Sequence, residues 1–342
     1  MKKIIYTLIG ATVLLGACKD SDKKKLNNKA DLATNFSIEI LDEKALEIID
    51  PNSEIEVLAS GFSWTEGPLW IQQGQYLLFS DIPRNKIYKL DAHNDTTTYL
   101  YHSGFSGKDF KGDEPGSNGL LLNKHGELIL MQHGNRQIAT MNAPLDAPTP
   151  DFKALISSYK GKRFNSPNDG VLDKDGNLYF TDPPYGLPGK MDDPNKELSF
   201  QGIYCLLTNG ELVVLDSLSR PNGIGLSPDG SKLYVANSDP AQAAWYQYTI
   251  LEPGKLTQKE LFLDVTQLIG KKGQQGLPDG LKVNRQGILF ASGPGGIWII
   301  DPSGKPLARI HTGQATANCA FNNDEKKLFM TADNYIMSVD LK

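Results

Sequence analysis

A short pattern recurs along the chain: an acidic or amide residue stands just before a glycine and a hydrophobic residue, and a turn follows eight residues later. Five copies place a glycine in that turn, and these glycines lie 50 to 57 residues apart. A sixth, weaker copy has its turn at 324–326. The repeated acids and amides are Glu66, Asn118, Asn168, Asn222, Asp279 and Asn318.

Apolar segments rich in β-branched and aromatic residues follow each turn, which is typical of β-strands. The segments directly after the turns are 76–80, 127–131, 177–181, 232–236, 288–291 and 327–331. The next segments are 86–90, 137–141, 202–206, 245–249, 296–300 and 335–339, and some repeats add a fourth, such as 211–215. Repeats of this length built from four strands predict the blades of an all-β, six-bladed β-propeller. Two separate β-sandwiches are the alternative, which the unbroken eight-residue spacing disfavours.

The last repeat contains three strands, so its blade needs a fourth from elsewhere. Residues 55–60, ahead of the first repeat, form an unpaired predicted strand. We expect this strand to complete the last blade, because closing the ring removes an exposed sheet edge. No long segment has a helical period, and 264–269 is predicted to be a single short helix.

The first 17 residues differ from the rest of the chain. Two lysines precede an apolar run of twelve residues that ends at Leu15, and Gly16, Ala17 and Cys18 follow. This order predicts a bacterial lipoprotein signal peptide (1–17) and lipidation of Cys18. An ordinary secretory signal with a coincidental cysteine is the alternative. Residues 19–35 are polar and predict a flexible tether; we place the tether at 18–49 and the propeller at 50–342.

Composition narrows the range of partners. Hydrophobic residues make up 39% and charged residues 22%, as in soluble globular proteins, and the net charge is −5. The absence of a basic stripe argues against nucleic acid as a partner. Cys205 and Cys319 lie in or beside predicted strands and are expected to be small buried residues. We expect a monomeric, exported lipoprotein that meets the membrane only through its lipid anchor, on the periplasmic face or cell surface.

Equivalent positions of a closed ring converge on its axis, so the repeated side chains should meet there. Two carboxylates and several amide oxygens favour a hard divalent cation, Ca²⁺ first, with Mg²⁺, Mn²⁺ or Zn²⁺ as alternatives. Each residue taken singly is also an ordinary turn former. The register of the whole set favours the metal.

The loop after each second strand should return to the same mouth of the channel. It carries Asp81, His133, Asp182, Asn237, Ser292 and Asp333. We predict substrate contacts from Asn118, His133, Arg163 and Asp182. The alternatives are a hydrogen-bonded loop histidine for His133, a surface arginine for Arg163, and a stiff turn for the Asp182 loop.

Several of these segments together resemble the gluconolactonase/regucalcin (senescence marker protein) family over roughly residues 50–342. The matching segments are 66–70, 163–170, 180–186, 221–223 and 277–280, and they are most similar to bacterial gluconolactonases. The resemblance implies a six-bladed propeller with one divalent cation held by Glu66, Asn168, Asn222 and Asp279. It also implies that Asp279 is the catalytic acid/base. Where regucalcin has Arg-Phe-Asn-Asp, this chain has Ser-Pro-Asn-Asp at 166–169.

These patterns predict a metal-dependent lactone hydrolase that acts on an aldonolactone such as gluconolactone. The cation would polarise the lactone carbonyl. The alternatives are hydrolysis of organophosphates or other esters at the same cation, and a non-catalytic, lipid-anchored propeller that binds a sugar or peptide.

Overall fold

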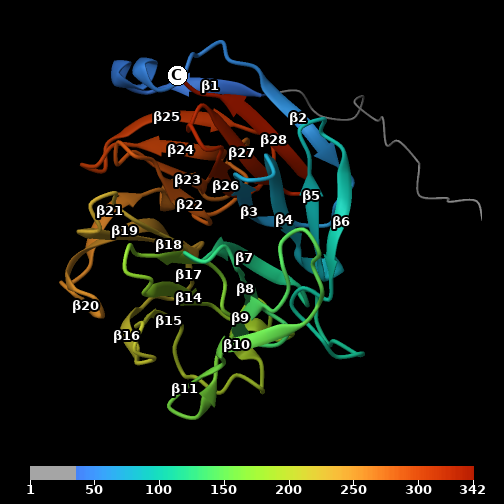
Figure 1. Ribbon diagram of the computed structural model, residues 1–342. Helices are drawn as coiled ribbons and strands as arrows, with labels where there is room; N and C mark the ends of the chain where they lie inside the picture. Colours follow the sequence, from blue (N-terminus) through green and yellow to red (C-terminus); the bar gives the residue numbers. More distant parts are fainter. Residues whose placement is uncertain (1–35) are drawn as a thin grey trace, which may run out of the picture. The chain divides into compact units, whose positions relative to one another are not determined.

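Six antiparallel sheets stand around one axis as the blades of a β-propeller (Figure 1). The computed structural model describes residues 36–342, where only four short 3-10 helices, η1 (Glu43–Glu47), η2 (Ile82–Arg84), η3 (Lys190–Asp192) and η4 (Thr266–Leu268), accompany the strands. The short helix predicted at 264–269 is η4. Within that range no helix is both long enough and apolar enough to cross a membrane.

Each blade follows the chain from an inner to an outer strand. Blade 1 is β3 (Thr65–Ile71), β4 (Tyr76–Asp81), β5 (Lys86–Leu90) and β6 (Thr96–Tyr101). Blade 2 is β7 (Ser117–Leu122), β8 (Leu128–Gln132), β9 (Gln137–Met141) and β10 (Phe152–Ile156). Blade 3 is β13 (Gly170–Leu172), β14 (Leu178–Asp182), β15 (Gly202–Leu206) and β16 (Leu212–Ser217). A small hairpin precedes it, formed by β11 (Ser158–Tyr159) and β12 (Lys162–Arg163).

Blades 4 to 6 repeat this order. Blade 4 is β17 (Pro221–Leu226), β18 (Lys232–Asp239), β19 (Gln242–Glu252) and β21 (Glu260–Asp264), and β20 (Lys255–Leu256) pairs antiparallel with the end of β19. Blade 5 is β22 (Leu281–Val283), β23 (Leu289–Gly293), β24 (Gly296–Ile300) and β25 (Pro306–His311). Blade 6 is β26 (Thr316–Phe321), β27 (Lys327–Ala332) and β28 (Tyr335–Asp340), completed by β2 (Ile55–Ser60).

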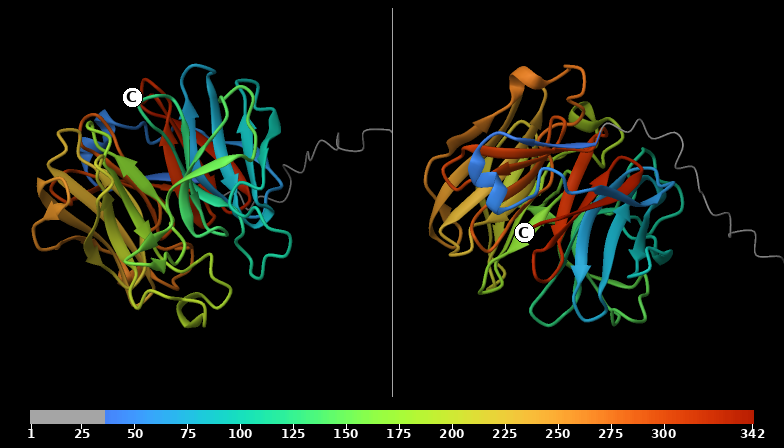
Figure 2. Two further views of the ribbon diagram at one scale, coloured as in Figure 1. Left: turned by 60° about the horizontal axis from the view of Figure 1, so that its bottom comes forward. Right: turned by 90° about the horizontal axis from the view of Figure 1, so that it is seen from above.

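The N-terminal strand closes the ring as predicted. β2 pairs antiparallel with β28, from Ile55 beside Val339 to Ser60 beside Tyr335. In Figures 1 and 2 the blue start of the described chain therefore lies beside its red end. The last blade gains its outer strand, and β28 presents no free edge.

The predicted tether boundary at residue 49 is wrong, because the folded part of the chain begins earlier. β1 (Ser37–Ile40) pairs with β25 as a fifth strand of blade 5. η1 follows, and Ala45, Ile48 and Ile49 are buried against blades 5 and 6. These apolar residues stand among charged neighbours, so the composition of the segment did not indicate that it is folded. Cys18 and the predicted signal peptide lie outside the described residues.

One hydrophobic cluster fills each of the six gaps between neighbouring blades. In β4, for example, Leu78 packs toward blade 2, whereas Leu77 and Phe79 pack toward blade 6. Both faces of the strand are thus buried, which explains why these strands are continuously apolar instead of alternating. The rigid packing holds the inner strands in place around the axis.

Candidate functional site

The inner strands bring five of the six repeated side chains to one cavity on the axis. Glu66, Asn118 and Asn222 lie near the starts of β3, β7 and β17, while Asn168 and Asp279 lie two residues before the starts of β13 and β22. All five line a cavity of about 250 Å³. The four predicted metal ligands are thus brought together.

Glycines allow the inner strands to approach this closely. A Cβ atom on Gly67 would lie 2.0 Å from the carbonyl oxygen of Asn118, and one on Gly223 would lie 2.1 Å from that of Asp279. Gly67 also has a φ of +53°. The glycine in the repeated pattern therefore makes room for the next blade, and the residue before it is directed at the axis.

The oxygen atoms in the cavity suit a hard cation. Oδ1 of Asn118, Asn168 and Asp279 is buried, and none has a hydrogen-bond partner among the described protein atoms. Within residues 36–342 no three His, Cys, Asp or Glu side chains gather at a metal-like spacing. The ligand set is instead two carboxylates mixed with amide oxygens, which fits Ca²⁺ or Mg²⁺ better than zinc.

The electrostatics of the two carboxylates lead to the same conclusion. Burial raises the pKa of Glu66, and the neighbouring Asp169 carboxylate raises it further. Burial likewise raises the pKa of Asp279 well above its usual range, with a further contribution from the charge of Glu66. Two desolvated acids that repel each other are stabilised in their ionised form by a cation between them.

A second layer of polar contacts lies behind the ligands. Asn318 Nδ2 donates to Glu66 Oε2 at 3.2 Å, and Lys282 Nζ donates to Asn318 Oδ1 at 3.3 Å. Lys282 also lies 3.9 Å from the carboxylate of Asp169. Asn318, the sixth repeated position, thus orients Glu66, a predicted metal ligand, and does not line the cavity. No sequence pattern identified Lys282, which reaches the axis only because β22 is an inner strand.

Two of the predicted substrate-binding residues lie elsewhere. Arg163 is exposed, and its guanidinium donates to the carbonyl oxygen of Asn135 at 3.0 Å. The carboxylate of Asp182 is fully buried and accepts hydrogen bonds at 2.8 Å from the backbone N–H groups of Asn165 and Ser166. Neither lines the cavity, so their predicted role is corrected.

The Asp182 contact belongs to a recurring clamp. Asp81 accepts from the backbone N–H of Ser63 in blade 1, and Asn237 accepts from that of Arg220 in blade 4. Asp81 and Asp182 end their second strands, and Asn237 lies two residues before the end of β18. Each of these three side chains therefore folds back onto the loop before the inner strand of its blade. The prediction that these three side chains face the channel mouth is wrong. Each accepts a hydrogen bond from a backbone N–H group that would otherwise lack a partner.

His133 is buried behind the cavity wall and reaches the cavity through another residue. Its Nδ1 atom lies 3.1 Å from Oε2 of Glu114, and Glu114 lines the cavity. Tyr185, Lys190 and Trp64 also line it. These residues come from loops between strands, where the sequence has no periodic pattern. Sequence reasoning therefore missed Glu114, Lys190 and Trp64, whereas Tyr185 belongs to the Asp182 loop, which was expected beside the mouth of the channel.

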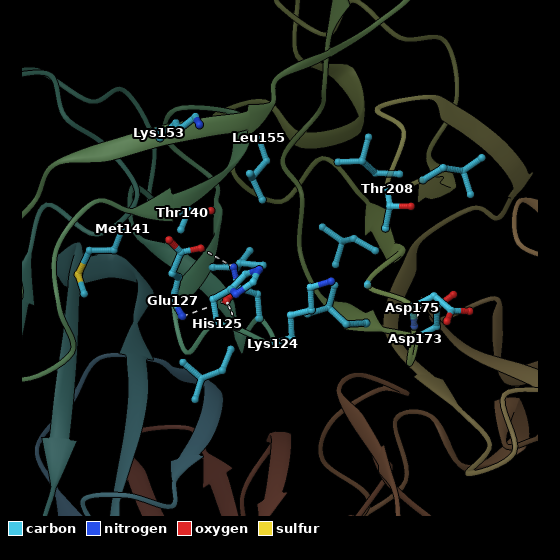
Figure 3. Close-up of a pocket in the computed structure, with 18 of the residues that line it drawn as sticks. Lys124, His125, Glu127, Thr140, Met141, Lys153, Leu155, Asp173, Asp175 and Thr208 are labelled. Atoms are coloured by element: carbon cyan, nitrogen blue, oxygen red, sulfur yellow. Dashed lines mark hydrogen bonds between the residues drawn. The ribbon is translucent and has the colours of Figure 1, made fainter.

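A larger cavity of about 530 Å³ lies between blades 2 and 3 and is lined by Lys124, His125 and Glu127 on one side and Asp173 on the other (Figure 3). It sits beyond the last residue of β7, whereas the site lies at the first residues of that strand. Similar cavities lie at the turns between blades 1 and 2 and between blades 3 and 4. They are a recurring consequence of blade packing and contain none of the predicted site residues.

The fold and site define a six-bladed propeller with an oxygen-lined axial cavity. The family model for the SMP-30/Gluconolactonase/LRE-like region matches residues 64–334, and the chain belongs to this family. Gluconolactonase from Zymomonas mobilis is 39% identical over 300 residues, covering 86% of this chain and 83% of the relative. The solved gluconolactonase of Xanthomonas campestris superposes with a TM-score of 0.76 at 26% identity, covering 90% of this chain and 95% of that one. Diisopropyl-fluorophosphatase of Loligo vulgaris is 27% identical over 181 residues, covering 50% of this chain and 55% of the relative.

Proposed function

We propose that the protein is a metal-dependent lactonase whose substrate is an aldonolactone. Its family and its gluconolactonase relative make it a lactonase-type hydrolase. The observation that carries the metal dependence is the convergence of two carboxylates and three amide side chains on one axial cavity. Among them, Oδ1 of Asn118, Asn168 and Asp279 is buried without a hydrogen-bond partner among the described protein atoms.

Glu66, Asn168, Asn222 and Asp279 would hold the cation, and Ca²⁺ is our first candidate. When bound, such an ion polarises the lactone carbonyl and stabilises negative charge on its oxygen. Asn222 is held in place because its Nδ2 atom donates to Ser238 Oγ at 3.3 Å. Asn318 fixes Glu66 in the same way from behind.

The remaining lining suits a ring with several hydroxyl groups. Glu114, Lys190, Asn118 and Tyr185 offer hydrogen-bond donors and acceptors of both charges. Trp64 adds an aromatic surface. A purely aliphatic lactone would leave most of these polar groups without partners, which disfavours its binding.

Hydrolysis of organophosphate esters at the same cation is the second candidate, and the likeness to diisopropyl-fluorophosphatase favours it. A phosphotriester, like a lactone, presents a polarised oxygen to the cation and is attacked by water. A propeller that binds a sugar or peptide without turnover is the third possibility.

A pH-stat assay separates these functions. The protein is stripped with a chelator, reloaded singly with Ca²⁺, Mg²⁺, Mn²⁺ or Zn²⁺, and offered aldonolactones, aliphatic lactones and phosphotriesters. We expect aldonolactone opening that disappears on chelation and returns with Ca²⁺. Full activity of the stripped protein would overturn the metal dependence. Faster turnover of phosphotriesters would favour the second candidate, and metal binding without any turnover the third.

A further inference from the structure

Lactone hydrolysis needs a group that accepts a proton from the attacking water, and Asp279 is poorly suited to that task. We assign Asp279 as a metal ligand, and a carboxylate bound to a cation is a weak base. The cavity is lined by three carboxylates, those of Glu66, Asp279 and Glu114. Glu114 alone among them is not an assigned ligand.

Glu114 reaches the cavity from the long loop between β6 and β7. Its side chain is 23% exposed, so it meets both the protein and the cavity contents. It lies close enough to Asp279 for its negative charge to contribute to the raised pKa of that residue. Tyr185, another cavity residue, is a poor alternative base because burial raises the pKa of its hydroxyl above the usual range.

His133 fixes the orientation of Glu114. The imidazole is completely buried, with Nδ1 3.1 Å from Glu114 Oε2. Its backbone N–H donates to the carbonyl oxygen of Gly116 at 3.1 Å, which ties β8 to the loop that carries Glu114. Gly186 packs against the ring so closely that a Cβ there would lie 2.6 Å from that of His133. A buried histidine held on two sides and directed at a cavity carboxylate resembles the base-and-orienter pairs of hydrolases.

We propose that Glu114, oriented by His133, is the general base and then the general acid of the lactonase reaction. This inference rests on the proposed function. Glu114 takes a proton from water as the water oxygen bonds to the lactone carbonyl carbon, and the carbonyl π pair moves to the carbonyl oxygen. A lone pair of that oxygen then re-forms the carbonyl π bond as the ring C–O bond breaks. The electron pair of the broken bond goes to the ring oxygen, and Glu114 returns the proton to that oxygen. The product is the hydroxy acid, and Glu114 is regenerated as a carboxylate.

The test compares Glu114→Gln with Asp113→Asn in the metal-loaded protein. Asp113 is the exposed neighbour in the same loop, so both variants lose one negative charge there, but only the first changes the cavity. We expect Glu114→Gln to lower kcat about 100-fold or more, in line with general base catalysis, and Asp113→Asn to leave kcat unchanged. Calorimetric titration with Ca²⁺ should show saturable binding to both variants, which also shows that both are folded. The affinity should be that of the wild type in Asp113→Asn and lower in Glu114→Gln, because a negative charge near Asp279 is lost. Formate should partly restore turnover to Glu114→Ala.

His133 is tested as a positioning residue through a double-mutant cycle. His133→Asn retains an N–H donor near the Nδ1 position and should retain more activity than His133→Phe. In the Glu114→Gln background, neither substitution should lower kcat further. An additive loss of kcat would show that His133 acts independently of Glu114, and would remove it from the proposal.

The outcomes separate this inference from the proposed function. Wild-type kcat in Glu114→Gln, or a change confined to KM, overturns the role of Glu114 while lactonase activity stands. A wild-type protein that opens no lactone overturns the proposed function and this inference with it.

Discussion

At the scale of single residues, several acidic side chains and one ammonium group lie close together at the axis of the propeller. Glu66, Asp169 and Asp279 are almost completely buried or lie in the axial cavity, and Lys282 is the ammonium group that partly balances them. Burial raises the pKa of all three acids. Burying such a cluster of acids costs free energy of folding unless the charges are balanced, and this is the physical reason to expect a bound cation there.

Substitution of Glu66 by Gln should weaken cation binding by more than about tenfold. Substitution of residues that only orient a metal ligand already lowers metal affinity by about 10–100-fold. The isosteric amide keeps an oxygen that can accept from the N–H of Gly67, so the fold should be preserved. Calorimetric titration with Ca²⁺ measures the change. Glu127→Gln, an exposed glutamate in blade 2, is the matched control and should bind normally. Equal affinity in the two variants would remove Glu66 from the ligand set.

At the scale of elements, the clamps between second strands and entry loops determine where each inner strand starts. The Asp182 carboxylate holds the loop that carries Asn165 and Ser166, two residues short of the predicted ligand Asn168. Asn165 also donates from Nδ2 to the carbonyl oxygen of Asp182 at 2.9 Å. The clamp therefore positions Asn168 without lining the cavity.

The Asp182 clamp should make stability depend on pH. Burial raises the pKa of Asp182 to about 7, above its value in the unfolded chain. The folded state thus binds the extra proton, so this contribution to stability is complete below about pH 4 and is lost as pH rises toward 7. Between these limits the free energy of unfolding of the wild type should fall more steeply than that of Asp182→Asn, by up to about 1.4 kcal/mol per pH unit. Denaturant titrations at several pH values measure this difference. Parallel pH curves for the two proteins would contradict the prediction.

At the scale of the whole molecule, the ring is closed by an N-terminal strand paired with a C-terminal one. The additional strand β1 and helix η1 brace blades 5 and 6 from outside. Closure fixes all six inner strands relative to one another, so it is the condition for one shared site.

Two N-terminal deletions test this closure. Relative to a chain that starts at residue 36, one that starts at residue 50 loses β1 and η1, including the buried Ala45, Ile48 and Ile49. It should be less stable by several kcal/mol, because a fully buried isoleucine contributes about 1.5–3 kcal/mol. A chain that starts at residue 61 also loses β2, and should aggregate or fail to bind Ca²⁺ because β28 becomes an exposed edge. Thermal melts and Ca²⁺ titrations distinguish the three chains. Equal melting temperatures for starts at 50 and 61 would show that β2 does not close the ring.

Membrane attachment is a separate prediction, made for residues outside the described part of the chain. We propose that Cys18 is lipidated and anchors the exported protein. Cys18→Ala in the full-length chain should move the protein out of the membrane fraction or stall its processing, as fractionation and mass spectrometry of the mature N-terminus would report. Normal maturation with retention at the membrane would refute the assignment. Cys205→Ala, a substitution at a buried free cysteine, is the control.

The sequence by itself determined the strands, the number of blades and the axial position of Glu66, Asn168, Asn222 and Asp279. It could do so because each of these features depends on local chemistry that repeats with the blade: apolar runs, turn glycines, and an oxygen-bearing residue before a glycine. Only the tertiary structure decided the rest. Glu114, Lys282 and Tyr185 reach the axis from loops and strands without a repeated pattern. β1 is stabilised by pairing with residues about 270 positions away, and η1 by packing against blades 5 and 6. Asp182 and Arg163 belong to matching segments, but neither lines the cavity. Asp182 accepts a hydrogen bond from a buried backbone N–H group, and Arg163 donates to a backbone carbonyl oxygen. A sequence does not show which backbone groups lie near a side chain in the folded protein.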